Sequence, residues 1–201
     1  MKKTLLSSAA ALFFILSAYS VSAETVSHTV VSGESMWKIA VKYKVGLSEI
    51  IAANPQISNP ALIYPGDKLK IPLTDTAVTD YETEVVRLVN EIRVKNGLSK
   101  LKQNWELCRV ARYKSQDMKD KNYFSHTSPT YGSPFDMMKR FGISYRTAGE
   151  NIAKGQSTPQ AVVNAWMNSS GHRANILNSS FTEIGVGYVK SGNYWTQMFI
   201  G

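Results

Sequence analysis

Two histidines and two glutamates in the second half of the chain have side chains that could transfer protons or bind a metal. This candidate catalytic set is His126, Glu150, His172 and Glu183, each in a short polar motif. Imidazole and carboxylate groups act as general acids and bases, and together they can bind zinc or copper. Only the fold can bring together residues so far apart in sequence. Catalysis, metal binding through His126 and His172, and a hydrogen-bonded cleft that only binds a ligand therefore stay open.

The chain offers no evident nucleophile to act with these four residues. It has no Gly-x-Ser-x-Gly motif, and its single cysteine, Cys108, follows Leu107 on the apolar side of a helical pattern. One thiol cannot form an internal disulfide, so we expect Cys108 to be buried and structural. Two classes of function fit: a binding or regulatory module, or a hydrolase that uses a divalent metal such as zinc.

The elements that must position the set fall within residues 80–201, where the pattern predicts a layered α+β domain. The predicted helices are one from Thr79, one from Asn104, one over 133–141 and one from Pro159. The predicted strands are 144–153, 184–189 and 194–200, the last two as a hairpin. A tight turn over 170–173 should carry His172.

Side-chain type predicts which faces of these elements are buried. On the helix after Asn104, Leu107 and Ala111 should face the core, while Arg109 and Arg112 should face solvent. Three aromatic residues are expected in the core rather than as ligand platforms. They are Trp166, Trp195 and Phe199.

Five motifs in this part of the chain follow one another in a characteristic order. They are Y-F-S-H (123–126), G-E-N-I-A (149–153), S-S-G-H-R-A-N-I-L (169–177), F-T-E-I-G-V-G (181–187) and Y-W-T-Q-x-F (194–199). Together they resemble the CAP superfamily of cysteine-rich secretory, antigen 5 and pathogenesis-related 1 proteins, in its disulfide-free bacterial branch.

The CAP resemblance implies an α-β-α sandwich whose cleft is lined by two histidines and two acidic residues. His126, Glu150 and His172 match three of these positions. The second acid has no match in residues 166–170, where relatives carry it, and Glu183 is our substitute. The family serves varied binding and signalling roles, so the resemblance does not imply an enzyme.

A separate small module precedes this domain. Its pattern predicts a strand, two helices and a strand, over 28–31, 36–43, 47–54 and 68–71. It contains V-x-x-G-E-S-x-W-x-I-A (30–40), E-I-x-x-x-N-P (49–55) and I-Y-P-G-D-x-L-x-I-P (63–72), which closely resemble the LysM domain.

The LysM resemblance implies binding of N-acetylglucosamine-containing glycans such as peptidoglycan, in a shallow groove between two loops. The residues that would contact the sugar are Gly33, Glu34, Ser35, Met36, Trp37, Ile63, Tyr64 and Gly66. Trp37 has an alternative role in packing the small core, and His28 is expected at a strand edge rather than as a ligand. With this module, the hydrolase alternative would act on cell-wall material or envelope proteins.

The first 23 residues have the pattern of a secretory signal peptide. Two lysines precede an apolar run, and Val21-Ser22-Ala23 supplies small residues for cleavage after Ala23. The run is too short and too serine-rich for a transmembrane anchor. We therefore expect a secreted, cell-wall-associated protein, of the vegetative wall or the spore envelope. Its expected parts are a signal peptide (1–23), a LysM domain (24–73), a linker (74–79) and a CAP domain (80–201).

Charge is unevenly distributed between the two modules. Residues 24–77 carry five basic and five acidic side chains, whereas residues 78–201 carry sixteen basic and ten acidic ones, a net charge of +6. A basic domain on an exported protein favours anionic wall polymers or lipid headgroups, although a solvated basic face explains the charge equally well. No basic run with interleaved aromatics points to nucleic acid. The expected partners are peptidoglycan and an unknown CAP ligand or envelope protein.

Overall fold

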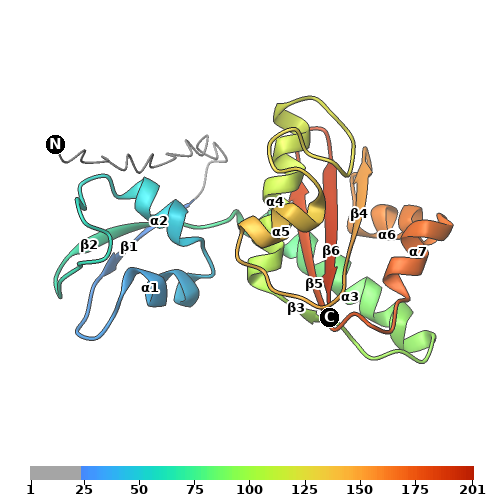
Figure 1. The fold of residues 1–201 in the computed structure, drawn as a ribbon, viewed down its shortest axis with the longest axis horizontal. Helices are drawn as coiled ribbons and strands as arrows, with labels where there is room; N and C mark the ends of the chain where they lie inside the picture. Colours follow the sequence, from blue (N-terminus) through green and yellow to red (C-terminus); the bar gives the residue numbers. More distant parts are fainter. Residues whose placement is uncertain (1–23) are drawn as a thin grey trace, which may run out of the picture.

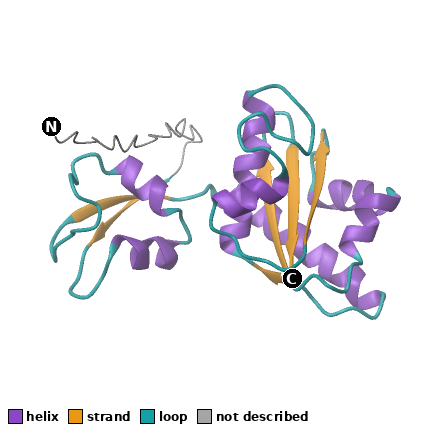
Figure 2. Cartoon of the chain, in the orientation of Figure 1, coloured by secondary structure: helices purple, strands orange, loops and turns teal. Residues whose placement is uncertain are grey.

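The computed structural model describes residues 24–201, and the predicted signal peptide lies outside them. The described chain forms two modules, each with its own sheet (Figure 1). The first runs from β1 (Thr25–Thr29) to β2 (Lys68–Pro72), and the second from α3 (Thr76–Lys95) to β6 (Tyr194–Ile200). Both contain helices and strands (Figure 2), which confirms the predicted α+β class. Within residues 24–201, no helix has the length and hydrophobicity needed to cross a membrane.

The first module packs two helices against a two-stranded antiparallel sheet. Ser35 caps α1 (Met36–Tyr43) by accepting a hydrogen bond from the Lys38 amide, and α2 (Leu47–Ala53) follows a short turn. The predicted order of strand, helix, helix and strand is confirmed. One apolar core joins the four elements, and its buried members are Val30, Met36, Ile39, Ala40, Val45, Ile50, Leu69 and Ile71.

The second module places a four-stranded sheet between two layers of helices, the expected α-β-α sandwich (Figure 1). The strand order is β3 (Lys102–Gln103), β5 (Glu183–Val189), β6, β4 (Ala148–Lys154). β6 is antiparallel to both of its neighbours, and β3 runs parallel to β5. One layer contains α4 (Trp105–Asp120) and α5 (Pro134–Arg140); the other contains α3, α6 (Pro159–Met167) and α7 (Ser170–Ile176).

Alternating side chains of the central strand β6 supply both cores. Trp195 and Phe199 pack with α3 and α6 on one face, where Trp166 is also buried. Met198 and Ile200 pack with α4 and α5 on the other. The predicted core positions of the three large aromatics are therefore confirmed.

Two glycines of β5 let the backbone of α4 lie directly on the sheet. A Cβ atom at Gly185 would lie 2.3 Å from the carbonyl carbon of Leu107, and one at Gly187 would lie 2.1 Å from the Arg112 nitrogen. Any other residue would push the helix away from the sheet. The G-V-G of the fourth CAP motif is thus required by helix–sheet packing.

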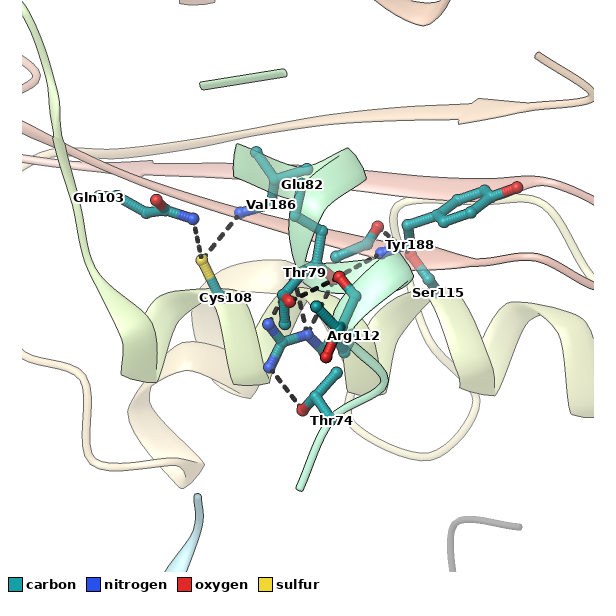
Figure 3. A network of polar contacts seen from close by, with 11 residues as sticks. Thr74, Thr79, Glu82, Gln103, Cys108, Arg112, Ser115, Val186 and Tyr188 are labelled. Carbon is teal, nitrogen blue, oxygen red and sulfur yellow. Dashed lines mark hydrogen bonds and ion pairs between the residues drawn. The ribbon is translucent and has the colours of Figure 1, made fainter. Parts of the chain in front are cut away.

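Side chains rather than a strand cover most of the outer edge of β5 (Figure 3). The two-residue β3 pairs only with the first two residues of β5. Beyond it, the Val186 amide donates to Cys108 Sγ at 3.4 Å and the Tyr188 amide donates to Glu82 Oε1 at 3.1 Å. Arg112 holds the buried Glu82 carboxylate through Nε at 2.8 Å. Cys108 is buried, as predicted.

The structure differs from the sequence prediction at two helix starts. α3 begins at Thr76, because Asp75 accepts from the Ala77 amide at 2.8 Å and caps the helix there, so the helix takes up most of the predicted linker. Residues 170–173, predicted as a tight turn, form the start of α7. The prediction that Arg109 and Arg112 face solvent is wrong, because both are engaged in ion pairs with glutamates.

Candidate functional site

The second module contains a hydrogen-bonded histidine–glutamate pair at the sheet surface. His126, in the loop after α4, places Nδ1 2.7 Å from Oε1 of Glu150 on β4. The side chain of Glu150 is only 1% exposed, whereas that of His126 is 52% exposed. The imidazole therefore joins a buried carboxylate to solvent, an arrangement that can relay a proton or recognise a polar ligand.

Lys114 supports the histidine–glutamate pair and was not among the residues predicted from the sequence. It is fully buried on α4, and its Nζ donates to the backbone carbonyls of Ser125 at 2.8 Å and His126 at 2.7 Å. It thereby fixes the loop that carries the imidazole, and its charge also acts on Glu150. A signal was present, because Lys114 lies at helical spacing from Leu107 and Ala111 on an otherwise apolar stripe.

A second buried carboxylate holds the rest of this loop. Asp117, one turn further along α4, accepts from Tyr123 and Ser128 hydroxyls at 2.6 Å each and from Thr130 at 2.5 Å. Burial raises the pKa of Asp117, but these hydrogen bonds outweigh burial and the pKa is lowered overall. The carboxylate therefore stays charged and keeps the loop ordered near His126.

The environment of Glu150 raises its pKa. Burial raises the pKa of Glu150, and the hydrogen bond of His126 and the charge of Lys114 offset this only in part, so that the pKa remains above its ordinary value. Its Oε2 is buried without a hydrogen-bond partner among the described residues. A carboxyl group with a raised pKa beside an imidazole is suited to proton exchange.

Replacing His126 with phenylalanine should raise the pKa of Glu150 further. The ring would still cover the carboxylate, but the hydrogen bond that stabilises its charged form would be lost. Carbon-13 NMR of the Glu150 carboxyl group during a pH titration measures this. His28→Phe, in the other module, is the control and should leave the titration unchanged. A Glu150 pKa that stays constant or falls in the His126 variant would contradict the pairing.

His172 lies on α7, which packs against β4 beside Glu150. The His172 carbonyl accepts from Asn151 Nδ2 at 3.1 Å, and Asn175 Nδ2 donates to the Glu150 carbonyl at 3.2 Å. Burial lowers the pKa of His172, and the charge of His126 lowers it further, so the two imidazoles lie within electrostatic range. The structure thus brings His126, Glu150 and His172 to the same end of β4.

Glu183 lies elsewhere on the sheet. It is the first residue of β5, and its Oε2 accepts from Asn104 Nδ2 at 2.6 Å, at the start of α4. β6 separates β5 from β4, and two strand spacings amount to roughly 10 Å. The structure does not bring Glu183 to the His126–Glu150 pair, and its hydrogen bond ties α4 to the sheet.

The described residues give no support to the predicted metal set of His126 and His172. Among residues 24–201, no group of three or more His, Cys, Asp or Glu side chains is arranged to hold a metal ion. The zinc or copper hypothesis therefore finds no support among residues 24–201.

The two loops expected to hold a sugar in the first module are joined at their bases. Val30, before the first loop, exchanges backbone hydrogen bonds of 2.9 Å with Gly66 and Asp67, at the end of the second. Trp37 beside the first loop is 51% exposed and Tyr64 in the second is 58% exposed. Trp37 therefore does not pack the small core and is free to meet a ligand.

The other residues predicted to contact the sugar take part in the fold of the first module. The Glu34 carboxylate accepts from the Val31 amide at 3.1 Å and lies 2.7 Å from Nε2 of the buried His28, so it holds the first loop. Ser35 caps α1, Met36 is in the core, and Ile63 packs against the core. Gly33 and Gly66 adopt positive φ in their turns.

The sandwich with its histidine–glutamate pair, preceded by the small module, defines a class of protein. The chain belongs to the cysteine-rich secretory protein (CAP) family, whose model matches residues 86–199. The LysM domain model matches residues 28–72, so a LysM domain followed by a CAP domain is shown. This combination supports a protein associated with the cell envelope, with a peptidoglycan-binding module.

Three proteins illustrate what this chain is similar to. The uncharacterized protein YkwD of Bacillus subtilis (strain 168) is 68% identical over 126 residues, 63% of this chain and 49% of that protein. The spore coat assembly protein ExsA of Bacillus cereus is 49% identical over 45 residues, 22% of this chain and 7% of that protein. An extracellular SCP-domain protein of Bacillus anthracis str. Ames has a solved structure with a TM-score of 0.60 and 38% identity, covering 68% of this chain and 47% of that one. The chain spans less than half the length of each of these three proteins.

Proposed function

We propose that this protein is exported, binds peptidoglycan through its LysM domain, and presents its CAP domain there as a binding or regulatory module. Export rests on the predicted signal peptide, residues 1–23. One relative of the LysM domain is named as a spore coat assembly protein, which favours the spore envelope as well as the vegetative wall as a location. The CAP ligand would meet the half-exposed imidazole of His126.

The observation that carries the peptidoglycan proposal is the exposure of Trp37 and Tyr64 beside the two joined loops. Large aromatic side chains are normally buried, so two exposed ones at adjoining loops favour a binding surface. Exposed aromatic walls suit an acetamido sugar, which offers a methyl group beside its amide. The net charge of zero over residues 24–77 also favours a neutral sugar over an anionic polymer.

For the CAP domain, the His126–Glu150 pair favours recognition over hydrolysis. The pair can exchange a proton with a polar ligand, but a hydrolase also needs a nucleophile or an activated water. Cys108 is buried, burial raises the pKa of its thiol, and its sulfur accepts from the Val186 amide, so it does not serve as the nucleophile.

Replacing Trp37 with alanine should weaken binding of the full chain to insoluble peptidoglycan by about tenfold or more, because an aromatic anchor contributes most of the energy of a small site. Co-sedimentation with purified peptidoglycan at high salt measures it, since salt removes electrostatic adsorption. Phe135→Ala is the control, because Phe135 is also an exposed aromatic residue but lies on α5 of the CAP domain. Wild-type binding that disappears with salt, or equal binding by the Trp37 variant, would contradict a sugar site.

A further inference from the structure

The LysM and CAP domains meet through a partly buried charge contact between α2 and α4. Arg109 donates from Nε to Glu49 Oε1 at 2.6 Å, and from Nη2 to Glu49 Oε2 at 2.9 Å and Ser48 Oγ at 2.8 Å. Tyr113 donates its hydroxyl to Glu49 Oε1 at 2.9 Å. Only 19% of the Arg109 side chain and 22% of the Glu49 side chain are exposed. A two-pronged arginine–carboxylate contact of this kind fixes both distance and orientation.

The CAP domain holds the arginine ready for this contact. Its guanidinium carbon lies 5.4 Å from the ring centre of Tyr113 and 5.1 Å from that of Phe141. Two aromatic neighbours restrict the side chain before Glu49 arrives, so less freedom is lost on docking. Burial raises the pKa of Glu49, but the hydrogen bond and charge of Arg109 outweigh burial and lower it overall, so the carboxylate is charged at neutral pH.

A glycine on the LysM side makes the close approach possible. A Cβ atom at Gly46 would lie 1.9 Å from Glu49 Oε2 and 2.2 Å from Arg109 Nε. The φ of Gly46 is −73°, which other residues adopt readily, so space rather than backbone conformation calls for glycine here. Both obstructing atoms are ends of flexible side chains. Alanine would therefore push the ion pair apart without unfolding the LysM domain.

The connection between the domains is short, and a hydrogen bond from the CAP domain fixes its position. Only residues 73–75 separate β2 from α3. Arg112, one turn after Arg109 on α4, donates from Nη1 to Thr74 Oγ1 in this connection at 3.2 Å. A short connection gives the two docking surfaces a high effective concentration, so a modest contact is enough to keep them together.

We propose that α4 of the CAP domain is a docking surface for the LysM domain, and that Gly46, Ser48, Glu49, Arg109 and Tyr113 form a latch that holds the two domains as one rigid body. The latch sets the direction in which the sugar-binding loops face relative to His126. Its existence does not depend on the identity of either ligand. It separates this chain from one in which the LysM domain is a loosely tethered anchor.

Nitrogen-15 NMR relaxation of the full chain tests the latch, because a rigid body gives both domains one rotational correlation time. In Arg109→Glu, which faces Glu49 with a like charge, the correlation time of the LysM domain should fall roughly twofold, toward that of a small independent domain. Gly46→Ala should act in the same direction from the other side of the contact. The charge-swapped double variant Glu49→Arg with Arg109→Glu should restore the shared value.

Arg87→Glu is the control, because Arg87 pairs with Glu84 and Glu91 on the exposed face of α3. It should leave the shared correlation time unchanged. Chemical shifts of the core amides show in each variant that both domains remain folded. The latch is overturned if the wild-type domains tumble independently, or if folded Arg109→Glu and Gly46→Ala proteins keep the shared correlation time.

Discussion

Replacing Arg112 with alanine should lower the free energy of unfolding of the CAP domain by about 3–5 kcal/mol, the usual cost of leaving a buried charge without its partner. Glu82 is fully buried, and Arg112 supplies it with hydrogen bonds from both Nε and Nη2 (Figure 3). In the variant, the Glu82 carboxylate would keep only its hydrogen bond from the Tyr188 amide. One amide does not compensate a carboxylate removed from water.

The size of this loss should depend on pH. Burial raises the pKa of Glu82, and Arg112 offsets the rise only in part. Without Arg112 the pKa rises further, so the folded variant holds a proton where the unfolded chain has released it. Stability then falls as pH rises above the ordinary carboxyl range, and the loss should be smaller at about pH 5 than at about pH 8.

Urea unfolding at the two pH values, followed by near-UV circular dichroism of the buried Trp166 and Trp195, measures the effect. Arg109→Ala is the matched control, one turn away on the same helix. Its partner Glu49 belongs to the other domain, so the stability of the CAP domain should change little. Equal losses of unfolding free energy in the two variants would refute the conclusion that Arg112 compensates the buried charge of Glu82. A loss in Arg112→Ala that is the same at both pH values would refute it as well.

Replacing Gly187 with alanine should destabilise the CAP domain by about 3 kcal/mol or more, at the upper end of the cost of overpacking. The new Cβ atom would lie 2.1 Å from the nitrogen of Arg112 and 2.2 Å from the carbonyl carbon of Ala111. These are backbone atoms of α4, so relief requires the whole helix to move off the sheet. That movement would also disturb Lys114 and the loop that carries His126.

Gly171→Ala is the control, because it makes the same substitution at a position where the added Cβ atom has open space. A Cβ atom at Gly171 would meet no described atom within 4 Å, and alanine favours a helix over glycine by up to about 1 kcal/mol. Thermal unfolding should therefore give a lower midpoint for the Gly187 variant and an equal or higher one for the Gly171 variant. Equal midpoints for Gly187→Ala and the wild type would show that α4 does not rest on β5 as described.

Local patterns in the sequence predicted the elements of both domains well. α1 was predicted over the residues that it occupies, and β6 likewise, because helical and alternating periodicity are strong in these segments. The start of α3 was missed because two capping signals compete there, and Asp75 caps the helix before Thr79 can. α7 was missed because one glycine in a short polar segment reads as a turn.

The candidate site was less accessible from sequence because it depends on strand order. His126 and Glu150 were found through their motifs, and the structure joins them. Glu183 was chosen by its motif, but no local pattern shows that β6 lies between its strand and β4. Periodicity likewise marks Arg109 and Arg112 as polar positions on α4, but it does not reveal that the neighbouring domain and α3 cover them.

The two edges of the CAP-domain sheet affect how copies of this protein behave when many of them are attached to one surface. Open strand edges pair with other chains and lead to aggregation. Cys108 and Glu82 cover the outer edge of β5, while at β4 the Trp166 ring nitrogen donates to the Ile152 carbonyl at 3.2 Å and Asn175 donates to that of Glu150. Copies attached side by side on one polymer would therefore pair less readily through these edges, because two amides of β5 and two carbonyls of β4 already have side-chain partners.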